Sequence, residues 1–155
     1  MSFIEIPPFV TEKERLFFIS MDNSDDWIQH KSSVSGRLSP LFYKIVYYRG
    51  IKSYLLKMYP NAIQDWHTDG VTLKRNTLIL HPLTENYAPY RSIDGESTKP
   101  IIADTQVKHS VVNNEYTRMN LQIPFVYSYK DVLDDDNNIV WKLLDKFYKE
   151  NDEQR

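Results

Sequence analysis

The stretch PIIADTQVKHSVVNNEYTRMNLQIPFVY, residues 100–127, contains three short runs rich in Ile, Val and Leu that polar turn residues separate. The last run alternates between an apolar set and a polar set, which are Met119, Leu121, Ile123 and Phe125 on one side and Arg118, Asn120 and Gln122 on the other. A period of two is typical of a β-strand, because successive side chains point to opposite faces of the sheet. One face of this strand is therefore polar, either because it is exposed or because polarity serves a purpose there.

Similar runs rich in Tyr, Ile, Val and Leu precede this stretch along the chain. They are FYKIVYY (42–48), SYLLKMY (53–59), AIQDW (62–66) and NTLILHPL (76–83). Seven strand-like runs without long helical patterns between them predict a mainly β fold, and a jelly roll fits their number. We expect one domain over residues 1–155 with its core at about residues 42–127, because this length suits a single hydrophobic core.

Helices are expected at the two ends of the chain. Thr11 and Glu14 match a capping box, although the apolar residues that follow them could equally form a strand. Ser24–Trp27 has the pattern of a capped helical turn. Residues 139–149, IVWKLLDKFYK, place their apolar side chains on one helical stripe and predict a C-terminal helix.

Composition excludes several classes of function. The formal net charge of −2, with both signs mixed along the chain, gives no indication of nucleic-acid binding. The chain has no cysteine, so any metal site must use His and carboxylate ligands. The N-terminal segment lacks the pattern of a signal peptide, and no apolar run reaches the length of a membrane span. We therefore expect a soluble cytoplasmic protein with no membrane partner.

Three residues are candidate metal ligands. In DWHTDG, residues 65–70, His67 and Asp69 share one face of a strand and can bind one ion together. Asp65 has the same parity and is a competing carboxylate, and His-x-acid patterns also arise by chance. His109, in the later run VKHSVV, supplies a second imidazole. Two imidazoles and one carboxylate form the facial triad of non-haem Fe(II) oxygenases, which leaves coordination positions open.

Arg118 lies on the polar face of the last strand-like run. If that face points into the fold, a buried arginine requires an anionic partner, and its planar guanidinium matches a carboxylate in two parallel hydrogen bonds. A dicarboxylate cosubstrate would supply this partner. If the face points outward, Arg118 is an ordinary solvated side chain.

Together, His67-x-Asp69, His109 and Arg118 resemble the motif of the Fe(II)- and 2-oxoglutarate-dependent oxygenases. The similarity covers about residues 54–124 and is closest to the small prolyl-hydroxylase-like and aspartyl-hydroxylase-like members. It implies a double-stranded β-helix in which the two histidines and Asp69 are the catalytic Fe(II) ligands and Arg118 binds 2-oxoglutarate. It also implies O2-dependent hydroxylation of an amino acid or a peptidyl side chain, with decarboxylation of 2-oxoglutarate to succinate.

The resemblance suggests roles for further residues, each with an ordinary alternative. Tyr59 would contact the cosubstrate, or else pack in the core. His81 is similar to a cosubstrate-contacting histidine of the aspartyl hydroxylases, but its spacing departs from theirs, so we do not assign it to the site. Arg75 would lie near the substrate, or else be an exposed loop residue. The polar segment 84–99 would serve as a lid or substrate loop.

Two other functions are compatible with the same residues. One is a cupin-like metalloenzyme that does not use 2-oxoglutarate. The other is a non-catalytic jelly-roll protein with a binding or structural role, in which the metal ligands are coincidental.

Overall fold

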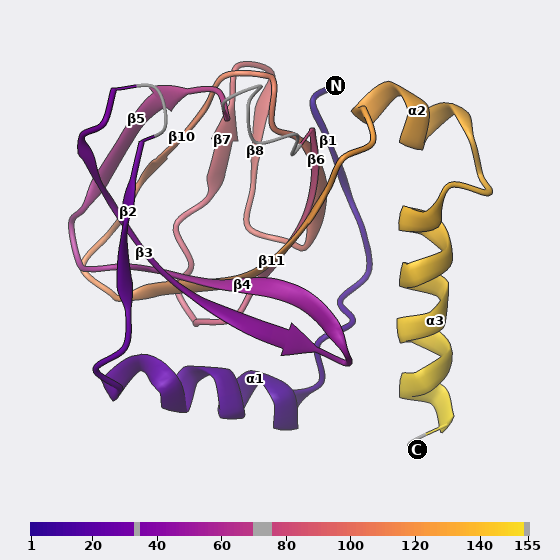
Figure 1. Ribbon diagram of the computed structural model, residues 1–155, viewed down its shortest axis with the longest axis horizontal. Coiled ribbons are helices and arrows are strands. Elements are labelled where there is room, and N and C mark those ends of the chain that lie inside the picture. The colour runs from indigo at the N-terminus through magenta and orange to yellow at the C-terminus, as the bar shows by residue number, and fades with distance from the viewer. Residues whose placement is uncertain (33–34, 70–75, 154–155) are drawn as a thin grey trace.

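The computed structural model describes residues 1–32, 35–69 and 76–153, which form two antiparallel sheets with helices along the outside (Figure 1). The larger sheet has the order β1 (Phe3–Glu5), β9 (Ile101–Asp104), β6 (Thr77–Pro82), β11 (Arg118–Phe125), β4 (Ile51–Met58), β3 (Leu38–Tyr48) and β2 (Ile28–Lys31). The smaller sheet has the order β5 (Ile63–His67), β10 (His109–Val112), β7 (Tyr90–Ser92) and β8 (Gly95–Ser97).

The predicted mainly β fold is confirmed. From β4 to β11 the chain passes back and forth between the two sheets, and β11 returns to pair with β4. This strand order is consistent with the expected jelly roll. Each of the seven strand-like runs contains a strand, whereas the short strands β1 and β2 were not predicted.

The expectation of a lid at residues 84–99 is wrong. Strands β7 and β8 lie in this segment and form half of the smaller sheet, and Tyr87, Tyr90 and Ser97 are buried. The segment is therefore part of the β framework. The sequence did not indicate these two strands, because the segment is polar and strands of three residues are too short to show a clear alternation of polar and apolar side chains.

The helices follow their capping signals. Helix α1 (Glu12–Ser20) begins with the predicted capping box, in which the Thr11 side chain accepts from Glu14 N and the Glu14 side chain accepts from Thr11 N. The short 3-10 helix η1 (Met21–Asn23) ends before Ser24, so the helical turn expected at Ser24–Trp27 is not formed. Helix α2 (Tyr129–Asp134) precedes α3 (Ile139–Glu153), which confirms the predicted C-terminal helix.

Two apolar clusters show which face of the larger sheet is which. Met119 and Leu121 of β11 pack in one cluster with Phe18 of α1 and Phe147 of α3. The other cluster contains residues of both sheets, including Leu80 of β6 and Tyr90 of β7, and therefore lies between them. Since side chains alternate along β11, Arg118 and Asn120 face this space between the sheets. The polar face of the strand points inward.

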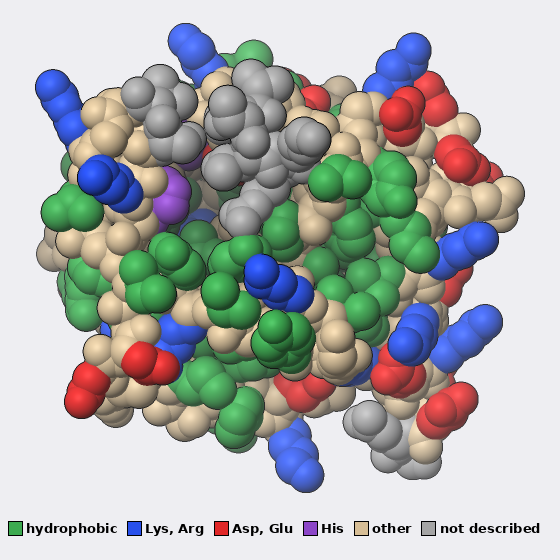
Figure 2. All heavy atoms as spheres, viewed as in Figure 1, with side chains coloured by type: hydrophobic (Ala, Val, Ile, Leu, Met, Phe, Trp, Pro, Cys, Tyr) green, Lys and Arg blue, Asp and Glu red, His purple; other side chains and the backbone are tan. Residues whose placement is uncertain are grey.

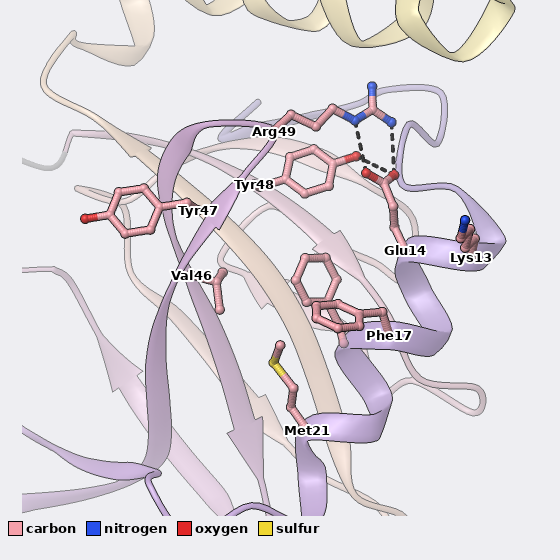
Figure 3. A pocket seen from close by; sticks show the side chains of 9 residues that line it. Lys13, Glu14, Phe17, Met21, Val46, Tyr47, Tyr48 and Arg49 are labelled. Atoms are coloured by element: carbon pink, nitrogen blue, oxygen red, sulfur yellow. Dashed lines mark hydrogen bonds and ion pairs between the residues drawn. The ribbon is translucent and has the colours of Figure 1, made fainter. Parts of the chain in front are cut away.

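Arg49 links the helices to the larger sheet. It lies in the β3–β4 turn, where Arg49 and Gly50 both have positive φ angles of 48° and 84°, as a two-residue hairpin turn requires. Its guanidinium donates to Glu14 of α1, to Asn151 of α3 and to two backbone carbonyls, those of Phe9 and Phe147. Beside Arg49, a hollow of about 500 Å³ between α1 and β3 is lined mainly by apolar side chains (Figure 3).

No described helix is both long and apolar enough to span a membrane.

Candidate metal centre

His67, Asp69 and His109 meet at one end of the smaller sheet. His67 ends β5 and His109 begins β10, and the two are direct partners in the antiparallel register. Their ring centroids are 4.3 Å apart. Asp69 Oδ1 lies 3.4 Å from His109 Nε2 and 3.8 Å from His67 Nε2, and one candidate ligand atom of each residue lies within 4.8 Å of the others. The structure thus brings the three predicted ligands together.

Backbone carbonyls orient both imidazole rings in the same way. His67 Nδ1 is 2.7 Å from the carbonyl oxygen of Asp65, and His109 Nδ1 is 2.8 Å from that of Val107. A carbonyl can only accept, so each Nδ1 must carry the proton and each Nε2 keeps its lone pair when the ring is neutral. Both Nε2 atoms face Asp69. Hydrogen bonds from Nδ1 to a backbone carbonyl, as both histidines form here, typically orient histidines that bind metal ions.

The carboxylate that faces both histidines is that of Asp69, not that of Asp65. Asp65 is exposed and contributes its carbonyl oxygen to His67, and its side chain is not among the converging groups. The Asp69 backbone N donates to the Thr105 carbonyl at 3.0 Å, and Gln106 Nε2 donates to the Asp69 carbonyl at 3.2 Å. These bonds tie the segment after β5 to the connection between β9 and β10, and so hold Asp69 beside the histidines.

The electrostatic environment favours a neutral His67. Burial lowers the pKa of His67, and the nearby His109 and His30 lower it further, although the Asp65 carbonyl and Asp69 oppose the shift. A neutral imidazole is the form that binds metal ions. The Gln64 side-chain nitrogen lies 3.1 Å from His67 Nε2, so a metal ion there would replace this hydrogen bond.

Arg118 is buried between the sheets, where no described residue supplies it with an anionic partner. It is 3% exposed, its Nε donates to the Ala88 carbonyl at 2.9 Å, and its guanidinium carbon lies 4.0 Å from the centroid of the Tyr87 ring. Among the described residues, its Nη2 has no hydrogen-bond partner and no carboxylate lies within 4.0 Å of the guanidinium nitrogens. Burial lowers the pKa of Arg118, although arginine stays charged. Such a group fits a carboxylate ligand.

Residues that the sequence did not indicate connect the two parts of the site. Tyr87 covers Arg118, and the Tyr90 ring stacks on His109 with a centroid distance of 5.4 Å. The Tyr90 hydroxyl and Oδ1 of Asn120 are buried without a hydrogen-bond partner among the described residues, and the Tyr87 hydroxyl lies beside the Asn120 side chain. Burial raises the pKa of Tyr87 and of Tyr90, so both hydroxyls keep their protons. No spacing or motif distinguishes these tyrosines from the other nine in the chain.

Neither Tyr59 nor His81 lies on the face of the larger sheet that carries Arg118. Tyr59 packs against Phe42 and lies beside Lys57, on the face of β4 opposite to Arg118, so it does not reach the Arg118 guanidinium. His81 does not point into the barrel, because its Nε2 accepts from Phe9 N and Val10 N on the helix-covered face. In both cases the position of the side chain depends on which face of the strand points between the sheets, and the sequence alone leaves this open.

The third weaker prediction, a substrate-binding Arg75, lies outside the described residues. Comparison of the chain with protein-family models and with curated protein sequences found no match.

Proposed function

We propose that this protein is an Fe(II)- and 2-oxoglutarate-dependent oxygenase that hydroxylates an amino acid or a peptidyl side chain. The observation that carries the proposal is Arg118, a buried cation with no carboxylate partner among the described residues, in the same interior as a group of two histidines and one aspartate. A metal centre of another class needs the histidines and the aspartate but has no use for a buried unpaired guanidinium.

His67, Asp69 and His109 would hold Fe(II) on one side and leave its other positions open. When bound, iron and 2-oxoglutarate supply O2 activation, in which decarboxylation of 2-oxoglutarate to succinate is coupled to hydroxylation of a C–H bond. The carbonyls of Asp65 and Val107 keep the histidine rings aimed at Asp69. The contact between Tyr90 and His109 restricts the second ring further.

Arg118 would bind the distal carboxylate of the cosubstrate. A charge-assisted pair is stronger in this buried setting than in water, because the local dielectric constant is lower. The Tyr87 hydroxyl is protonated and buried, and would donate a further hydrogen bond. The same burial keeps water away from the guanidinium.

The proposal is tested by release of carbon dioxide from 2-oxoglutarate labelled at its 1-carboxylate, with Fe(II) and O2 present. We expect metal-dependent release, and Arg118→Gln should raise the KM for 2-oxoglutarate roughly 100-fold because the buried charge is lost. Arg91→Gln is the matched control, since Arg91 contacts Trp66 on the outer side of the smaller sheet. Absence of release from the wild-type protein, or equal KM values for the two variants, would contradict the proposal. A cupin-like metalloenzyme would bind metal but show no such release.

A further inference from the structure

The larger sheet extends past the jelly-roll strands by β3 and β2, and this extension leads into the site. The register places Ile28, Tyr43 and Leu56 in one row across β2, β3 and β4, and the next member of the row is Asn120. Residues of one row share a face of the sheet, so the face that carries Ile28 and Tyr43 is continuous with the interior that holds Arg118.

Strand β3 of this extension lies close to β5 of the smaller sheet. Residues of β3 come within 8 Å of residues of β5, measured between Cα atoms, and β5 ends at His67. His30 of β2 is one of the groups whose charge acts on His67. Helices α1 and α3 cover the opposite face (Figure 1).

The face is apolar and partly exposed. Ile28 and Ile45 are 52% and 49% exposed, and the rings of Tyr43 and Tyr54 meet edge to face with centroids 6.1 Å apart. In the view of Figure 2, hydrophobic side chains gather over the part of the molecule where β2 and β3 lie, near a histidine side chain. Exposed apolar patches of this kind are typical of binding surfaces.

The charges on this face do not match a free amino acid. A free amino acid carries an ammonium and a carboxylate, and its tight binding requires a partner for each. On the described strands β2, β3 and β4, the face includes His30 and Lys52 but no acidic side chain. The middle of a polypeptide has neither terminal charge, so it suits this surface better.

Strand β2 also offers a backbone edge. It is the last strand in the order of the larger sheet. Edge strands bind extended peptides through main-chain hydrogen bonds, and alternate peptide side chains then continue the rows of the sheet. A side chain placed next to Ile28 in this way would point to the side on which β5 and the metal centre lie.

We propose that the substrate is a side chain of an extended, uncharged and largely apolar polypeptide segment that pairs with the edge of β2 and packs on Ile28, Tyr43 and Ile45. This inference rests on the proposed function and selects the peptidyl substrate over the free amino acid.

The test uses a library of N-acetylated, C-amidated octapeptides with Val, Leu or Tyr at alternate positions and Ser or Gly between them. Binding to the 15N-labelled protein is followed by amide chemical shifts, without iron or turnover. We expect shifts at residues 28–31 and 41–47, and at least tenfold weaker binding by backbone N-methylated versions of the peptides. Ile45→Lys should weaken binding at least tenfold, whereas Phe17→Lys, at a 61% exposed position on α1, should not.

Absence of shifts at β2 and β3, or equal shifts with free valine and tyrosine, would overturn the inference. Equal binding of the N-methylated peptides would overturn the pairing with β2. If the library binds but no carbon dioxide is released from 2-oxoglutarate, the oxygenase proposal fails and the peptide site stands. If carbon dioxide is released but the peptides do not bind, the peptide site fails and the oxygenase proposal stands.

Discussion

Two buried cations on neighbouring strands differ in whether an anion accompanies them. Lys57 of β4 pairs with Asp22, with 3.0 Å between Nζ and Oδ1, and its Nζ lies 4.4 Å from the centroid of the Trp27 ring. Arg118 of β11 has the Tyr87 ring and the Ala88 carbonyl but no carboxylate among the described residues. Both cations bear a desolvation cost, but Asp22 offsets part of it at Lys57, whereas no described carboxylate offsets it at Arg118 in the ligand-free protein.

This difference predicts opposite effects of the same kind of substitution. Arg118→Met should raise the free energy of unfolding of the ligand-free protein by about 1 kcal/mol, because it removes an unpaired buried charge; the lost bond to Ala88 limits the gain. Lys57→Met should lower the free energy of unfolding by about 2 kcal/mol, because Asp22 loses its partner. Urea unfolding monitored by circular dichroism measures both values. A loss of stability in Arg118→Met as large as that in Lys57→Met would contradict this account.

At the scale of elements, His81 fixes the N-terminal segment to β6. Its Nε2 accepts from Phe9 N at 3.2 Å and from Val10 N at 3.3 Å, while its Nδ1 donates to the Pro82 carbonyl at 2.8 Å. These bonds require a neutral ring. Burial lowers the pKa of His81 to about 4, although the Pro82 carbonyl and Glu14 oppose the shift.

The depressed pKa of His81 predicts an acid-sensitive docking of this segment. In the unfolded chain the imidazole binds a proton near pH 6.5, whereas in the folded protein it does so only near pH 4. Its contribution to stability is therefore complete above pH 6.5 and is lost as the pH falls toward 4, by about 3 kcal/mol in total. His81→Gln, which keeps an acceptor, should show a correspondingly flatter dependence of unfolding free energy on pH between 6.5 and 4. Identical slopes for the variant and the wild type would exclude this role of His81.

How far the sequence predicts these elements depends on their length and on local signals. The capping box at Thr11 and the apolar stripe of α3 are local features, and both helices form where they indicate. Strands β7 and β8 are three residues long and polar in composition, so their place in the smaller sheet depends on pairing with β10, which sequence does not reveal.

The sequence also predicted the candidate site only in part. His67 and Asp69 share a strand face, and their spacing alone makes them potential ligands, whereas their meeting with His109 depends on the pairing of β5 with β10. Alternation along β11 separates Arg118 from its apolar neighbours but does not say which face is inside. Here the inner face is the polar one, because α1 and α3 cover the apolar one.

At the scale of the whole molecule, the two-sheet architecture gathers distant parts of the chain around one interior. Strand β5 brings His67, β10 brings His109 and β11 brings Arg118. Strand β7 supplies Tyr90, which stacks on His109, and the segment before β7 supplies Tyr87, which lies beside Arg118. The apolar side chains of β11 pack with α1 and α3 on the other side of the larger sheet, so its polar side chains point into the interior. The architecture thus places the three candidate metal ligands and the buried Arg118 around the same interior.

The most direct test of this account is the absorption spectrum of the protein mixed anaerobically with Fe(II) and 2-oxoglutarate. We predict a weak visible charge-transfer band that requires both components. The band should be lost in His67→Ala and kept in His81→Gln, whose histidine lies on the helix-covered face. A wild-type protein without this band, or a band that persists in His67→Ala, would contradict the assignment of the metal centre.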